Sequence, residues 1–250
     1  MKSRNEGSPK RGPCKALLLA GGMGSRLRPL TDTIPKCLVP VNGKPLLDYW
    51  LDALEVAGIR EALINTHHLA DLVRQHVTDA NRTRSLSIVE SFEPVLLGSG
   101  GTVHANRDWM DDGDDCLIIY VDNLSNVDLA EVIDFHRGHE DPVTMMLFRT
   151  PYPSQCGIAE LDDSGRITDF VEKPEEPKSD LANAGLYVVT AGAYREMADQ
   201  DAFDLGFDVL PNFVERMRGW IFEGYHRDIG TLNALEEACI DAQQVFGGER

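Results

Sequence analysis

The sequence has 250 residues, is 42% hydrophobic and carries 24 basic against 41 acidic residues, giving a formal net charge of −17 at pH 7. This size and apolar content fit a globular domain with a substantial core, and the charge argues against nucleic-acid or membrane-surface binding, because both need a basic face. Six of the seven charged residues from position 11 to position 44 are nevertheless basic. This stretch is either a basic surface face or a site for a small polyanion such as a nucleotide.

The five cysteines are widely spaced, and no two of them form a C-x-x-C pair. Neither a disulfide framework nor a structural zinc site is therefore expected, and a reducing cytoplasm is favoured. No apolar run reaches transmembrane length, and the run at 16–20 is too short for a signal peptide. We expect residues 1–13 to form a flexible polar leader and residues 14–250 to form one domain.

Short apolar runs alternate with stretches of helical periodicity, which predicts an α/β architecture. In the first part of the chain, strands are predicted at 14–20, 61–65, 85–90, 116–121 and 143–149, and helices at 45–57, 69–77, 103–110 and 129–139. The second part is richer in strands. It contains a predicted hairpin at 157–170, strands at 184–189 and 220–223, and helices at 208–218 and 232–246.

A glycine-rich loop follows the first predicted strand, with Ala20, Gly21, Gly22 and then Gly24. Such loops let backbone N–H groups approach phosphate oxygens. The loop is not a P-loop, which ends in G-K-[ST], and it is not a dinucleotide fingerprint, because Leu27 stands where the third glycine would be. By itself, the loop indicates a phosphate-containing ligand but no particular reaction.

The loop continues into a longer motif: L-L-A-G-G-M-G-S-R-L-R-P-L-T at 18–31, P-K-C-L-V-P-V at 35–41 and K-P at 44–45. This motif resembles the sugar-nucleotide pyrophosphorylase family, the nucleotidyltransferases that make nucleoside-diphosphate sugars, and the resemblance extends from Lys15 to about Ala238. It implies a Rossmann-like mixed sheet flanked by helices, a glycosyltransferase-A-like nucleotidyltransferase fold with a β-rich sugar-binding half. The implied reaction joins a nucleoside triphosphate to a sugar 1-phosphate and releases pyrophosphate.

Two anions meet in that reaction, so the site must neutralise charge and hold the reactants in line. Arg26 offers a planar fork to the triphosphate and Lys36 a point charge, and the resemblance places both in the catalytic set with Lys173. The nucleotide-binding residues that it implies in and before the loop are Leu18, Ala20, Gly21, Gly22, Gly24 and Ser25.

Two aspartates are the expected metal ligands. Asp122 ends a predicted buried strand, where open α/β sheets bind ligands, and the family aspartate at this place holds Mg²⁺ against the nucleotide phosphates. Asp228 corresponds to the second carboxylate, and such a pair suits Mg²⁺. By themselves, Asp122 could be a turn residue and Asp228 a helix cap, although Thr231 could cap better. Val121 stands where the family usually has glycine, and we expect it to narrow the approach of the backbone to the sugar or ribose.

The sugar side is expected in the strand-rich half. Glu172-Lys173-Pro174 resembles the family's E-K-P element, with Lys173 on the sugar phosphate and Glu172 on a hydroxyl group. Asn183 matches the family's N-x-G element, whose asparagine commonly bonds the sugar. Gly157 would offer a backbone N–H to the same ligand. Asn123, which follows the metal aspartate, is also expected to bind the sugar. No histidine receives a catalytic role, because the sugar phosphate is already ionised at pH 7.

Base recognition is expected at residues 93–102, where L-G-S-G-G resembles the mannose and heptose 1-phosphate guanylyltransferases. The implied contacts come from Glu93, Gly98, Ser99 and Gly100, and Glu90 or Glu93 could accept two hydrogen bonds from guanine. GTP is therefore the first expectation. The alternative is a uridylyl- or thymidylyltransferase acting on a glucose- or amino-sugar 1-phosphate.

Other readings are weaker. A molybdopterin or cytidylyl-type enzyme would lack the P-L-T and P-K-x-L-x-P-V continuation, and a non-catalytic nucleotide-sugar sensor should have lost residues such as Arg26 or Lys36. Nucleoside triphosphate and sugar 1-phosphate are the expected partners, with no nucleic acid and no membrane. The resemblance to the family also implies a homodimer. No β-helix or acyltransferase extension is expected after the last predicted helix.

Overall fold

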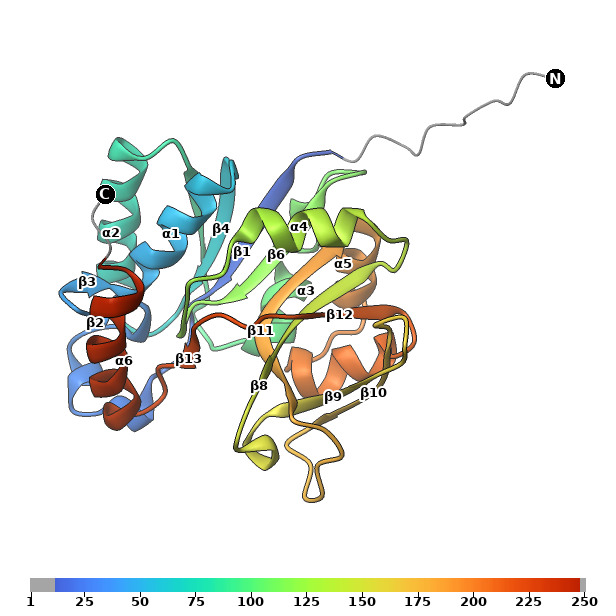
Figure 1. Ribbon diagram of the computed structural model, residues 1–250. Helices are drawn as coiled ribbons and strands as arrows, with labels where there is room; N and C mark the ends of the chain where they lie inside the picture. The colour runs from blue at the N-terminus through green and yellow to red at the C-terminus, as the bar shows by residue number, and fades with distance from the viewer. Residues whose placement is uncertain (1–11, 248–250) are drawn as a thin grey trace.

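The computed structural model describes residues 12–247, and within that range the chain forms a mixed nine-stranded sheet with helices on both faces (Figure 1). One half of the sheet is parallel, in the order β6 (Asp115–Tyr120), β1 (Cys14–Leu19), β4 (Glu61–Thr66) and β5 (Ser87–Phe92). Because both faces are covered, the inner strands are nearly continuous apolar runs. The predicted α/β class is confirmed.

The other half of the sheet is largely antiparallel. β11 (Leu181–Thr190) pairs antiparallel with both β6 and β8 (Val143–Arg149), and β12 (Met217–Ile221) runs parallel to β8. The hairpin of β9 (Gly157–Leu161) and β10 (Ile167–Glu172) extends the sheet beside the start of β11. The predicted hairpin and the strand-rich second part are therefore present.

Two apolar clusters fill the space between the sheet and its helices. Adjacent residues of β1 alternate between them, with Leu18 in one cluster and Leu17 and Leu19 in the other. The first cluster receives side chains from α1 (Leu46–Val56), α2 (Ala70–Thr83) and α4 (Leu129–Arg137), and the second from α3 (Gly98–Ala105) and α5 (Ala191–Ala198). A small third cluster joins α6 (Leu232–Val245) to the hairpin of β2 (Pro40–Val41) and β3 (Lys44–Pro45).

A short antiparallel ladder connects two distant parts of the sequence. β7 (Asn123–Ser125) pairs with β13 (His226–Asp228), which places Asp228 opposite Asn123. The Ile229 N–H donates to the Asp122 carbonyl at 2.9 Å, and the Trp50 indole N–H of α1 donates to the Asn123 carbonyl at 2.8 Å. The ladder therefore ties the ends of β6 and β13 together and anchors them on α1.

Several predicted elements differ from the structure. The helix predicted at 208–218 is wrong: the chain forms one π turn (Leu205–Val209) and a 3₁₀ turn (Leu210–Phe213), and then enters β12. Pro211 lacks an N–H for a continuous helix, and pairing with β8 takes over from Met217. The helix predicted at 103–110 begins earlier, at Gly98, and α5 was not predicted although Thr190 caps it through its hydroxyl.

Of the predicted leader, residues 1–11 lie outside the described residues, whereas Gly12 donates its N–H to the Gly113 carbonyl at 2.7 Å. The single domain over 14–250 stays a prediction. Between residues 12 and 247, no helix combines the length and apolar character needed to cross a bilayer. Of the two residues that could cap the last helix, Thr231 does so, since its hydroxyl accepts from the Ala234 N–H.

Replacing Trp50 with Phe tests the anchor of the ladder. The buried Asn123 carbonyl would lose the indole donor, so we expect the free energy of unfolding to fall by about 1–3 kcal/mol in urea denaturation. Trp220→Phe is the matched control, because that partly buried ring stacks on Phe222 away from the ladder. Equal losses in the two variants would contradict an anchoring role for the Trp50 hydrogen bond.

Candidate active site

Four charged side chains from distant parts of the chain meet at one place. Lys36 Nζ lies 2.6 Å from Asp122 Oδ2 and 3.8 Å from Asp228 Oδ1, and Arg26 Nη2 lies 3.9 Å from Asp228 Oδ2. Arg26 and Lys36 come from two 3₁₀ turns, Ser25–Leu27 and Lys36–Leu38, whereas the aspartates come from the ends of β6 and β13. We call this group the charge cluster.

In the charge cluster, the carboxylates of Asp122 and Asp228 lie close enough to repel each other. The pKa of Asp228 is raised above its ordinary range, first by burial and then by the negative charge of Asp122, while Lys36 and Arg26 act in the opposite direction. Such a pair suits a divalent cation, which would relieve the repulsion and can take one or two carboxylates. Between residues 12 and 247, no group of three or more His, Cys, Asp or Glu side chains is arranged to hold a metal. The remaining ligands would be substrate oxygens and water.

Two cavities meet at the charge cluster. The loop cavity, of about 220 Å³, is bordered by the glycine loop and α3. The hairpin cavity, of about 290 Å³, is bordered by the β9–β10 hairpin and β11. Three residues line both cavities: Tyr120, Asp122 and Asp204.

Many of the predicted site residues line these cavities. In the loop cavity they are Ala20, Gly21, Gly22, Lys36, Gly98, Ser99 and Asp122. In the hairpin cavity they are Arg26, Asp122, Asn123, Gly157, Glu172, Lys173, Asn183 and Asp228. Leu18, Gly24, Ser25, Glu93 and Gly100 line neither cavity.

The start of the glycine loop is held by an internal brace. Asn65 Oδ1 accepts from the Ala20 N–H at 2.6 Å and from the Gly21 N–H at 3.2 Å, so these two donors are engaged within the protein. Asn65 Nδ2 in turn donates to Glu93 Oε1 at 2.9 Å. Sequence reasoning missed Asn65, although a polar residue near the end of an apolar strand is the same signal that drew attention to Asp122.

Glu93 has a different setting from the one expected. Its side chain is 1% exposed, and its carboxylate accepts from Asn65, from the Thr102 hydroxyl at 2.5 Å and from the Leu97 N–H at 3.1 Å. Glu90 accepts from the Thr66 hydroxyl and from Arg74, outside the loop cavity. Neither carboxylate is placed to read guanine, and Glu93 instead connects the brace to the segment that precedes α3.

The remaining residues away from the cavities have structural settings. Leu18 is fully buried with its side chain in the core, and Ser25 is exposed in the turn that Gly24 begins. The Gly100 N–H donates to the Phe203 carbonyl at 2.9 Å rather than facing a cavity. In contrast to these residues, Val121 borders the loop cavity, although it is only 1% exposed and belongs to a core cluster, and it leaves the Asp122 carboxylate in the charge cluster.

The hairpin cavity combines an acid, a base and two fixed amides. Lys173 Nζ lies 3.7 Å from Glu172 Oε1, and burial raises the pKa of Glu172. Asn183 donates to the Tyr187 hydroxyl at 2.7 Å, and Asn123 donates to the Ala184 carbonyl at 3.2 Å. Burial also lowers the pKa of His226, in the wall of this cavity, to about 4, so its imidazole is neutral at pH 7.

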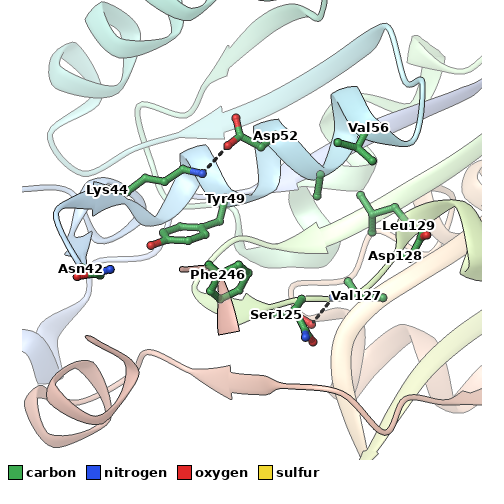
Figure 2. A pocket seen from close by; sticks show the side chains of 12 residues that line it. Asn42, Lys44, Tyr49, Asp52, Val56, Ser125, Val127, Asp128, Leu129 and Phe246 are labelled. Atoms are coloured by element: carbon green, nitrogen blue, oxygen red, sulfur yellow. Dashed lines mark hydrogen bonds and ion pairs between the residues drawn. The ribbon is translucent and has the colours of Figure 1, made fainter. Parts of the chain in front are cut away.

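A distal cavity of about 520 Å³ lies elsewhere, between α1, the β2–β3 hairpin, the β7–α4 connection and the end of α6 (Figure 2). Figure 2 shows Lys44 reaching along α1 to Asp52 and the rings of Tyr49 and Phe246 close together; these rings meet edge to face, with centroids 4.9 Å apart. None of the predicted site residues lines it. Despite its greater volume, we therefore place the candidate active site at the charge cluster.

Comparisons with known proteins found a matching family model, relatives and structures of similar fold. A family model described as nucleotidyl transferase matches residues 15–245. A glucose-1-phosphate thymidylyltransferase of Streptomyces griseus is 35% identical over 89% of this chain, and a mannose-1-phosphate guanylyltransferase of Mycobacterium tuberculosis is 32% identical over 90%. The chain spans 64% of the length of each of these two relatives. A crystal structure of a Bacillus anthracis protein in complex with a sucrose aligns with a TM-score of 0.81 and 22% identity, covering 94% of this chain and 100% of that one, which supports the fold alone.

Asn65→Ala tests whether the brace serves the loop cavity. It removes the acceptor of two loop N–H groups and a donor to buried Glu93, so we expect a stability loss of about 1–3 kcal/mol and roughly tenfold weaker nucleotide binding by calorimetry. Asn81→Ala is the matched control, because Asn81 bridges the N–H and the carbonyl of Ile88 on β5 in the same way. It should lose stability and keep its nucleotide affinity. The same affinity in both variants would refute the role of the brace.

Asp228→Asn tests the cost of charging Asp228, which comes first from burial and then from the repulsion of Asp122. Because the folded-state pKa of Asp228 is raised, the folded state binds more protons than the unfolded state, and stability is lost as pH rises from the ordinary aspartate range through the raised value. We therefore expect the variant to have a higher Tm than the unmodified protein at pH 7 without divalent cations, and the same Tm below about pH 3, where both states are protonated.

Asp162→Asn is the control of opposite sign. Hydrogen bonds from Ser164 and Arg166 hold the pKa of Asp162 below its usual range, so its charge stabilises the fold above that range. This variant should melt below the unmodified protein at pH 7. A lower Tm for Asp228→Asn at pH 7 would contradict a net cost of charging Asp228 in the folded state.

Proposed function

The chain belongs to the nucleotidyl transferase family, and we propose that it transfers a nucleotidyl group from a nucleoside triphosphate to a sugar 1-phosphate. The observation that carries the proposal is the charge cluster, which lies where the loop cavity and the hairpin cavity share Asp122. A reaction that joins two anions needs two adjoining sites and concentrated positive charge at their junction. The chain spans only 64% of the length of the two relatives described above, so we take their activity as support for the proposal.

The two substrates have distinct places in this proposal. The nucleoside triphosphate occupies the loop cavity, with Arg26 and Lys36 neutralising its phosphates, and the sugar 1-phosphate occupies the hairpin cavity, with Lys173 on its phosphate. A sugar-phosphate oxygen attacks the α-phosphorus, the bond to the bridging oxygen breaks, and pyrophosphate leaves. The attacking oxygen is already ionised at pH 7, so no general base is required, and His226, whose pKa is lowered to about 4, would be a weak base.

Asp122 and Asp228 would hold a Mg²⁺ ion in this proposal. Both lie within 3.8 Å of the same Lys36 Nζ, and their mutual repulsion is the feature that a divalent cation would relieve. When bound, the metal would neutralise charge on the phosphate oxygens as they rearrange. The fixed amides of Asn123 and Asn183 would shape the hairpin cavity, and Glu172 would accept from a sugar hydroxyl.

We propose GTP as the nucleotide, with a mannose- or heptose-type 1-phosphate as the acceptor. The support is the resemblance of residues 97–101 to guanylyltransferases and the guanylyltransferase among the relatives. Since neither Glu90 nor Glu93 faces the loop cavity, the base would be read by backbone groups beside Gly98 and Ser99. A thymidylyl specificity is the second candidate, supported by the thymidylyltransferase relative. We also propose a reducing, cytoplasmic setting, which fits the five free cysteines. We further propose that the protein forms a homodimer.

Asp122→Asn tests the reaction. In a pyrophosphate-release assay with GTP, dTTP, UTP or ATP against mannose and glucose 1-phosphates, we expect GTP to be turned over fastest and the variant to lose about 10²–10³-fold in kcat. Asp128→Asn is the control, because Asp128 only caps α4 and asparagine caps equally well. It should keep its activity.

Two outcomes would contradict the proposal at different levels. Tight nucleotide binding by the unmodified protein without pyrophosphate release for any sugar phosphate would identify a sensor instead of an enzyme. Faster turnover with dTTP or UTP than with GTP would overturn only the choice of base.

A further inference from the structure

The segment of residues 202–207, here called the dividing segment, forms a wall between the two cavities. Phe203 lines the loop cavity, Gly206 and Phe207 line the hairpin cavity, and Asp204 lines both. The Phe207 ring also lies under Lys173, whose Nζ is 5.4 Å from the ring centroid. Motif reasoning did not single out this segment, because its position depends on how it packs against α3.

The dividing segment is fixed closely against the start of α3. A Cβ atom at Gly98 would lie 2.3 Å from the Phe203 carbonyl oxygen, and one at Gly100 would lie 2.5 Å from the Ala202 carbonyl oxygen. The Leu205 N–H donates to Ser99 Oγ at 2.9 Å. The glycines of α3 therefore allow an approach that places the Asp204 carboxylate at the junction of the cavities.

Asp204 is the carboxylate of the hairpin cavity that lacks a cationic partner. Asp122 and Asp228 have Lys36, and Glu172 has Lys173, each within 4 Å. No ion pair joins Asp204 to any residue between 12 and 247; its oxygens accept from the Phe207 N–H at 3.0 Å and lie 3.4 Å from Ser99 Oγ. A carboxylate can accept about four hydrogen bonds, so capacity remains on the cavity side.

We propose that Asp204 selects the sugar 1-phosphate by charge, accepting a hydrogen bond from a sugar hydroxyl and repelling a sugar carboxylate. Asp204 and Glu172 lie beside the same residue, Gly206, and make this wall of the hairpin cavity acidic, whereas the cations of the site would contact phosphates. The accepted substrates are neutral or amine-bearing sugars, and hexuronic acid 1-phosphates are rejected. This assignment rests on the proposed function and adds a specificity-determining residue to it.

A purely structural role for Asp204 is the competing explanation, because its side chain caps the π turn through the Phe207 N–H. Asparagine and serine cap about as well as aspartate, but neither carries the charge. Asp204→Asn and Asp204→Ser therefore keep the cap and remove the repulsion. The substrate-selectivity ratio separates the two roles, since a weakened cap would lower turnover of all sugars alike.

The experiment compares three sugar 1-phosphates that differ only at C6: a hexose, its uronic acid and its 6-amino-6-deoxy form. The unmodified protein should turn over the hexose and the amine and discriminate strongly against the uronic acid. In Asp204→Asn, or in Asp204→Ser if the first variant folds poorly, the hexose-to-uronate ratio of kcat/KM should fall at least tenfold. Asp208→Asn is the matched control, because Asp208 accepts from the Asp204 N–H in the same turn but lines neither cavity. Its ratio should not change.

An unchanged ratio in active Asp204 variants, or an equal change in Asp208→Asn, would overturn the assignment of Asp204 alone. Absence of pyrophosphate release by the unmodified protein with every sugar phosphate would overturn the proposed function, and the assignment with it. A tenfold or larger fall confined to the Asp204 variants supports the assignment.

Discussion

The ladder between β7 and β13 holds together two carboxylates that would otherwise repel each other. Asp228 is fixed opposite Asn123, and the Ile229 N–H donates to the Asp122 carbonyl, so the two aspartates are positioned by backbone hydrogen bonds. Lys36 offsets part of the repulsion by lying between them, and Trp50 attaches the ladder to a helix of the core. The rest of the fold thus supplies the free energy that keeps a locally unfavourable arrangement in place, which is a common property of ligand sites.

The glycine-rich segments of this chain serve packing as much as ligand binding. The Ala20 and Gly21 N–H groups donate to Asn65, and a Cβ at Gly21 would lie 2.7 Å from the Asn65 amide nitrogen. The glycines at the start of α3 likewise accommodate the dividing segment. Because these backbone donors are engaged internally, the neutralisation of a bound phosphate would rest mainly on side chains such as Arg26 and Lys36, whose charges are stronger partners than neutral N–H groups.

Much of the fold could be predicted because its signals are local. Buried parallel strands are continuous apolar runs, and β8 begins and ends where the sequence pattern placed it. The helix predicted at 208–218 failed because the pairing of β12 with β8 is a tertiary contact that periodicity does not register. Asp122 could be singled out from its place after a buried strand, whereas the settings of Asn65, Glu93 and Asp204 depend on partners far away in the sequence. The roles of the site residues remain proposals.

The net charge of the whole chain is a poor guide to the electrostatics of the candidate active site. The chain carries −17 overall, yet around the two cavities Arg26, Lys36 and Lys173 offset most of the charge of four carboxylates, and charges farther away than about 8 Å are largely screened at physiological ionic strength. Lys36 is 10% exposed, so its field is screened less than that of Arg26, which is 66% exposed. For the same reason, the single carboxylate of Asp204, which has no cationic partner, matters for a bound ligand. Asp204 lies inside the screening distance of both cavities, where one charge without a partner affects a bound ligand more than the many exposed acids that set the net charge.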